Sequence, residues 1–155
     1  MQFEGTHVRQ HILDAVEAAV SSVPAIVSSA TASSDIEHPY SGAIADVSFI
    51  SEKSRKAAGH GMPHEGVLTR ELLVGVVVAA QVPLDMDVKQ FEGAVIGDLE
   101  RAMANNEALA EYANDWFLSE TEWNYAQDND APIVSAALAF TITYQTPTAD
   151  PGVAL

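Results

Sequence analysis

The stretch that decides the fold is Ile133–Thr146, IVSAALAFTITYQT, near the end of the chain. Large apolar side chains stand at every second position of this stretch, which is the pattern of a β-strand. The apolar positions are Val134, Ala136, Leu138, Phe140, Ile142 and Tyr144, and the alternate positions are Ser135, Ala137, Ala139, Thr141 and Thr143. At about 3.3 Å per residue the strand would run roughly 45 Å, which is long for a globular domain. We expect its small, polar second face to meet solvent or a neighbouring subunit.

Three further strands are predicted around it. Phe117–Tyr125 alternates and is joined to the last strand by the turn AQDNDAP, so the two should form a hairpin. The alternation places one set of side chains on each face: Phe117, Thr121, Trp123 and Tyr125 against Leu118, Glu120, Glu122 and Asn124. Val67–Gln81 is apolar on both faces, which predicts a strand that is covered on both sides. Ala43–Ile50 alternates as well and predicts an earlier strand.

Two segments have the spacing of amphipathic helices. The first has apolar residues at Val8, Ile12, Val16 and Val20, with Thr6 as the expected N-cap. The second has Val88, Phe91, Val95, Leu99 and Met103, with Asp85 or Asp87 as the cap and Asn105-Asn106 at its end. The order of elements predicts one α+β domain over residues 1–155. It should contain a mostly antiparallel four- to five-stranded sheet with two main helices packed on one face.

Two internal segments and the C-terminus lack any such period. Residues 28–42 are rich in Ser, Thr and Ala, and residues 52–66 combine basic residues with Gly and Pro, so both are expected to be mobile loops. The tail 147–155 is expected to be loose or to dock on a neighbour.

Composition narrows the functional classes. The 155 residues include 22 acids and 7 bases, a net charge of -15, which disfavours a protein that grips DNA through its phosphates. There is no cysteine, so disulfides, thiolate nucleophiles and cysteine-based zinc sites are excluded. The N-terminus does not resemble a signal peptide, and the longest apolar run, Leu72–Ala80, is too short for a membrane helix. We therefore expect a protein of the cytoplasm without membrane contact.

Motifs for catalysis or cofactor binding are missing from the sequence. His60 and His64 are four residues apart, but the intervening Gly and Pro prevent the helix that would align them for zinc. His7 and His11 would share a helix face without a further ligand. No P-loop, G-x-S-x-G or G-x-G-x-x-G occurs. We expect no catalytic, cofactor or metal site, and not an enzyme.

Two charged groups are candidates for a subunit interface. Lys53, Arg55 and Lys56 account for three of the seven bases, and Glu120 and Glu122 form an acidic stripe on one face of a strand. A basic patch and an acidic patch on different sides of one subunit make a heterologous contact, which can close into a ring. A solvated charged loop and a solvated acidic stripe are the alternatives.

The layout as a whole resembles the tail terminator proteins of long-tailed phages. The matching segments, in chain order, are THVRQHILDAVEAAV (6–20), AIADVSFI (43–50), TRELLVGVVVAAQV (69–82), DVKQFEGAVIGDLERAM (87–103) and AALAFTITYQT (136–146). The match is one of element order and hydrophobic positions, and it covers essentially the whole chain.

The resemblance implies a structural virion protein with no cofactor. Its copies would form a ring, expected to be a hexamer, at the head-proximal end of the tail after assembly in the host cytoplasm. That ring would cap the tail tube protein, end its polymerisation and join the head connector protein, with DNA passing through the lumen without specific binding. The alternatives are another head–tail completion or adaptor protein and a small ligand-binding module.

Overall fold

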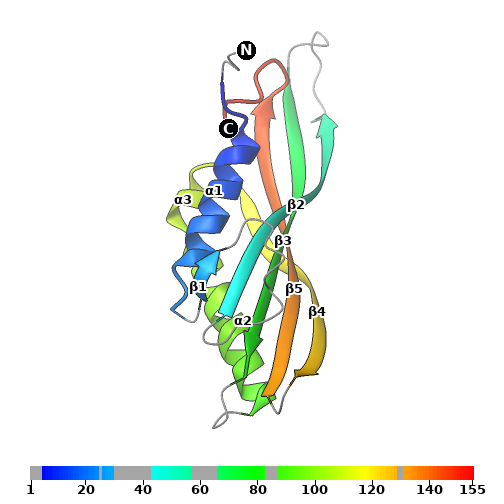
Figure 1. The fold of residues 1–155 in the computed structure, drawn as a ribbon. Coiled ribbons are helices and arrows are strands. Elements are labelled where there is room, and N and C mark those ends of the chain that lie inside the picture. Colours follow the sequence, from blue (N-terminus) through cyan, green and yellow to red (C-terminus); the bar gives the residue numbers. More distant parts are fainter. Residues whose placement is uncertain (1–4, 25, 30–42, 57–65, 83–86, 129–130) are drawn as a thin grey trace, which may run out of the picture.

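The computed structural model describes residues 5–24, 26–29, 43–56, 66–82, 87–128 and 131–155. These residues form one five-stranded sheet with helices on one side, which confirms the predicted α+β class (Figure 1). The elements, in chain order, are α1 (Val8–Ser21), β1 (Ile26–Ser29), β2 (Ala43–Lys56), β3 (Val67–Gln81), α2 (Val88–Ala104), α3 (Glu107–Ala110), β4 (Asp115–Asp128) and β5 (Ala131–Pro147). The strand order is β1-β2-β3-β5-β4, and all neighbours are antiparallel except β1 and β2.

The core lies between the helices and one face of the sheet, which we call the inner face. Every predicted inward position of β5, from Val134 to Tyr144, is buried, as are the matching positions of β3. Those positions of β3 are Leu72, Val74, Val76 and Val78. Each fully buried Leu, Ile or Phe contributes about 1.5–3 kcal/mol. The alternation in the sequence therefore predicted the inner face of both central strands correctly.

The β4–β5 hairpin forms as predicted, but the faces of β4 do not follow simple alternation. The pairing register shifts between Leu118 and Glu120, where Ser119 is an extra residue in the ladder. A β-bulge of this kind moves all following side chains to the other face. Phe117 therefore shares a face with Glu120, opposite Thr141 and Ala139 of β5. The prediction that Phe117 lies on the same face as Thr121, Trp123 and Tyr125 is wrong. The prediction that Leu118 shares a face with Glu120, Glu122 and Asn124 is wrong as well, because Leu118 lies opposite Phe140 on the inner face.

The helix caps differ partly from those expected. His7, not Thr6, caps α1, and its Nδ1 accepts a hydrogen bond from the Arg9 backbone nitrogen at 3.0 Å. Asp87 is the cap of α2, without a side-chain hydrogen bond. Asn106 caps α3 and also donates to the carbonyl oxygen of Ala15 at 3.0 Å, so one buried amide joins two helices.

Both segments expected to be loops begin with strand residues. β1 includes residues 28 and 29, and β2 runs on to Lys56, which pairs with Leu68. Exposed charged side chains do not prevent this pairing, because the backbone supplies the hydrogen bonds. The rest of the two predicted loops, 30–42 and 57–65, lies outside the described residues.

The C-terminal tail is not loose. The carbonyl of Pro151 accepts a hydrogen bond from the Val8 nitrogen at 3.1 Å, and the Leu155 nitrogen donates to the carbonyl of Gln145 at 3.1 Å. The tail therefore lies beside the start of α1 (Figure 1), where it satisfies one of the free amides that begin the helix.

Candidate interaction surface

The sheet face directed away from the helices, which we call the outer face, is apolar along its middle. Leu73, Gly75 and Val77 of β3 lie beside Ala137 and Ala139 of β5. At the sides, Ile50 of β2 is 52% exposed and Phe117 of β4 is 53% exposed. Most of these residues line a shallow hollow of about 280 Å³. The prediction that β3 is covered on both faces therefore does not hold beside this hollow, where Leu73 and Val77 are partly exposed, whereas Ala79 further along the same face is buried.

A close contact between two strands shapes this hollow. The register of β2 shifts between Phe49 and Ser51, and the side chain of the intervening Ile50 lies over Gly75. A Cβ atom at Gly75 would come within 2.9 Å of Ile50 Cδ1. The missing side chain of Gly75 thus provides the space in which Ile50 lies on the outer face.

The predicted charged groups lie at opposite edges of the outer face. Lys53 and Arg55 are on the outer side of β2, where Lys53 pairs with Glu71 of β3. Glu120 and Glu122 are on the outer side of β4, opposite Ala139 and Ala137 of β5. The structure does not bring the two groups together within one subunit, because β3 and β5 separate them.

Lys56, the third predicted basic residue, differs from the other two. Its partner is Leu68, so its side chain begins on the inner face of the sheet. Lys53 and Arg55, by contrast, line an outer-face hollow of about 400 Å³ together with Thr69, Glu71 and Thr143. The basic part of the outer face therefore consists of Lys53 and Arg55.

Along much of both edges, the described residues include no second strand to pair with. β1 pairs with β2 only at Ala43–Ala45, so within the described residues β2 has one strand neighbour from Val47 to Lys56. β4 pairs with β5 on one side and is the last strand of the sheet on the other. An open strand edge is a template for pairing with another chain.

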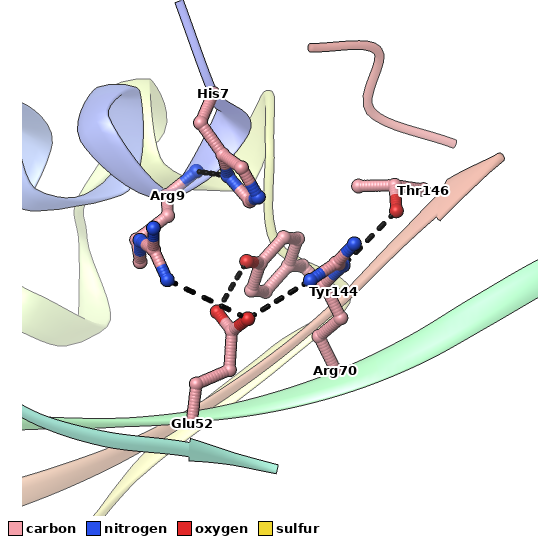
Figure 2. A network of polar contacts seen from close by, with 6 residues as sticks. All are labelled: His7, Arg9, Glu52, Arg70, Tyr144 and Thr146. Carbon is pink, nitrogen blue, oxygen red and sulfur yellow. Dashed lines mark hydrogen bonds and ion pairs between the residues drawn. The ribbon is translucent and has the colours of Figure 1, made fainter. Parts of the chain in front are cut away.

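A buried polar cluster fixes the basic edge to the rest of the sheet, and the sequence analysis did not find it (Figure 2). Glu52 Oε1 accepts a hydrogen bond from Arg70 at 2.9 Å, and Glu52 Oε2 accepts one from the Tyr144 hydroxyl at 2.5 Å. Arg70 also donates to Thr146 at 3.0 Å, and Arg9 of α1 lies 3.8 Å from Glu52 Oε1. The Glu52 side chain is only 9% exposed, so these donors replace the water that it loses.

The electrostatics of this cluster follow from its burial. Burial raises the pKa of Tyr144, and its hydrogen bond to the Glu52 carboxylate raises it further. Burial lowers the pKa of His7, and the nearby positive charges of Arg9 and Arg70 lower it further, against a smaller opposite effect of Glu52. Glu52 was predicted to lie in a loop. The available sign of a buried partner was Arg70, a charged residue at a position that shares its face of the strand with Leu72, Val74 and Val76.

The metal-ligating side chains of the described residues do not cluster. No group of three or more His, Asp or Glu residues there is placed to hold a metal ion. His7 is the cap of α1, and His11 stacks on Tyr112 with ring centroids 4.9 Å apart. His60 and His64 lie outside the described residues.

The space under α2 is small. A cavity of about 20 Å³ lies among Val78, Phe91, Val95 and Trp123, and Glu92 also lines it. Glu92 Oε1 is buried with no hydrogen-bond partner in the described residues. This volume suits about one water molecule, whereas pockets for small ligands measure roughly 300–1,000 Å³.

Neither a known protein family nor a curated protein sequence matches this chain. Among the helices of the described residues, none has the length and apolar character needed to cross a membrane.

Proposed function

We propose that the chain is a structural subunit of a phage tail, a tail terminator. Its copies form a ring, expected to be a hexamer, that caps the tail tube, ends polymerisation of the tube protein and joins the head connector. The observation that carries this proposal is the outer face, which is long, apolar in its middle and uncovered by the described residues. Exposed apolar patches rimmed by charge are typical of protein interaction sites.

The order of elements supports the same proposal. The five segments that carry the resemblance correspond to α1, β2, β3, α2 and β5. The last of these is the 17-residue strand β5, which pairs along its length with strands on both sides. A long, stiff sheet with one free face suits a scaffold that repeats around a ring.

The net charge of -15 also fits a ring through which DNA passes. A protein that neutralises few phosphates gains little of the counterion release that drives binding to DNA. The same charge keeps the free subunit soluble. We expect the lumen to let DNA slide without holding it.

Among the alternatives, an adaptor protein of the head–tail junction would use the same exposed face. A small ligand-binding module is disfavoured for the described residues, because the cavity under α2 holds about one water molecule and the larger hollows are open surface depressions.

The test is an assembly reaction with the tail tube protein of the same phage. Purified chain is added to polymerising tubes, and negative-stain images are scored for tube length and for rings at tube ends. We expect short tubes capped at one end. Leu73→Asp, which places a charge in the middle of the outer face, should abolish capping, while Glu107→Lys on α3 should retain it. Circular dichroism of both variants verifies folding, and tubes that grow to full length with the unmodified chain would refute the proposal.

A further inference from the structure

The two open edges of the sheet differ in charge. The edge at β2 presents Lys53 and Arg55, and the edge at β4 presents Glu120 and Glu122. All four side chains are on the outer face. The sheet therefore has a basic edge at β2 and an acidic edge at β4, with β3 and β5 between them. Opposite charges on directly facing strands stabilise pairing, and like charges oppose it.

We propose that copies of this chain join edge to edge, with β2 of one copy pairing antiparallel to β4 of the next. In this register Lys53 faces Glu122 of the neighbouring copy and Arg55 faces Glu120 of the neighbouring copy. The contact is heterologous, so it repeats and closes into a ring when the rotation permits. This proposal rests on the proposed function, since it states how the copies of the ring bind one another.

Strand direction makes the contact compatible with rotational symmetry. Four strands, β2, β3, β5 and β4, alternate in direction from one edge to the other. Because four is an even number, β4 runs opposite to β2, and a copy rotated about an axis roughly along the strands presents its β2 antiparallel to that β4. The outer faces of the two copies are then continuous, so the four charged side chains stay on one side of the joined sheet.

The short strand β1 selects the register. In the proposed register, residues 120–127 of β4 pair with β2 from residue 55 back to residue 47, with Ile50 left out of the ladder as it is within the subunit. Pairing therefore stops before Ala43–Ala45, which β1 occupies. Within one subunit, Lys53, Glu71, Thr143 and Asp115 lie side by side across the four strands. If the neighbouring copy were not shifted along the strand direction, its Lys53 would therefore lie opposite Asp115. That register would run β4 onto the positions held by β1.

The stagger agrees with the geometry of closed sheets. In the proposed register Lys53 lies opposite Glu122 rather than Asp115. The two residues of β4 are six ladder positions apart, because the bulge at Ser119 absorbs one residue, so each copy is shifted along the strand direction by about 20 Å relative to its neighbour. Four strands span about 19 Å across the sheet. The two lengths imply strands tilted by about 45° from the ring axis, at the upper end of the 35–45° that is usual for closed barrels.

A disulfide test uses the natural absence of cysteine. Ser54 and Thr121 face one another across the proposed contact, so Ser54→Cys/Thr121→Cys should form intermolecular disulfides on oxidation. Within one copy the two positions lie on opposite edges, about 14 Å apart or more, too far for a disulfide. Ser54→Cys/Asn124→Cys, whose second cysteine is on the other face, is the matched control and should remain uncrosslinked. Preferential crosslinking of Ser54→Cys/Asn114→Cys would overturn the register, and no crosslinking by any pair would overturn the contact.

Charge exchange provides the second test. Lys53→Glu/Arg55→Glu and Glu120→Lys/Glu122→Lys should each lose the oligomer in light scattering at low salt. An equimolar mixture of the two variants should form the oligomer again. In one variant both edges are acidic and in the other both are basic, so copies of the two variants can alternate. Assembly that survives either reversal would refute the edge contact. Rings that cap tubes despite the reversals leave the proposed function intact, whereas crosslinked rings that never cap tubes refute that function and leave the edge contact standing.

Discussion

The hydroxyl of Tyr144 donates a 2.5 Å hydrogen bond to Oε2 of Glu52, a residue 92 positions earlier in the chain. Tyr144 is the last large side chain of the inner face of β5, and Glu52 is on the distal part of β2. The bond therefore connects the basic edge of the sheet to its central strand. It adds a side-chain contact to the backbone pairing that continues β2 as far as Lys56.

Replacing Tyr144 by Phe should destabilise the protein by about 1–3 kcal/mol, because a carboxylate oxygen that is nearly buried loses its donor. Urea unfolding followed by circular dichroism measures the change. Tyr112→Phe is the control, since that hydroxyl has no hydrogen bond recorded within the described residues, and it should change stability by less than about 0.5 kcal/mol. Equal effects of the two substitutions would show that the Tyr144–Glu52 bond does not stabilise the fold.

The Arg70–Glu52 ion pair should be strongly coupled. Both side chains are largely buried, at 13% and 9% exposed. Arg70→Met leaves the Glu52 carboxylate with only the partly exposed Arg9, 3.8 Å away, as a counter-charge, and should cost up to about 3–5 kcal/mol. Adding Glu52→Gln to that variant should recover part of the loss, because no buried charge then remains. A double-mutant cycle on urea midpoints measures the coupling, and simple additivity of the two substitutions would contradict it.

Stability should fall in mild acid because of His7. Burial and the positive charges of Arg9 and Arg70 lower the pKa of His7 below its usual 6.5, so the unfolded chain binds a proton more readily than the folded one. The contribution of His7 is therefore complete above about pH 6.5 and is lost as pH falls through the lowered pKa. His7→Asn keeps a capping side chain and should flatten this part of the stability profile. Identical slopes between pH 5 and 7 in both proteins would rule the effect out.

The effect of Gly75→Ala on stability should depend on which residue occupies position 50. Glycine within a strand costs about 0.5–1 kcal/mol relative to alanine, but a Cβ at Gly75 would press on Ile50 Cδ1. It would also lie 3.2 Å from Oγ of Ser48, an exposed side chain that can rotate to another rotamer. Gly75→Ala should therefore gain nothing in the natural chain and stabilise the Ile50→Ala variant by about 0.5 kcal/mol. Thermal unfolding of the four proteins checks this, and a gain of the same size in both backgrounds would show that the contact exerts no pressure.

The inner faces of β3 and β5 were predictable because their alternation has a clear physical cause: every second side chain enters the core. The C-terminal end of β2 was not predictable. Its backbone pairing continues through residues such as Lys53, whose charged side chains give no apolar alternation in the sequence. The face of Phe117 was misassigned because nothing in its local sequence marks Ser119 as an extra residue. Glu52, Arg70 and Tyr144 come from three strands, so only the fold brings them together.

Ser119 has a consequence for how versions of this chain can differ in length. If the codon for that residue were deleted in frame, β4 would pair with β5 without a bulge. The side chains on one side of the deletion would then have to exchange faces of the sheet. Either Trp116 would leave the core in exchange for Phe117, or Glu120 and Glu122 would turn toward the helices. A one-codon change here therefore alters surface chemistry rather than strand length alone. Descendants that gained or lost it would need compensating substitutions along the rest of that edge.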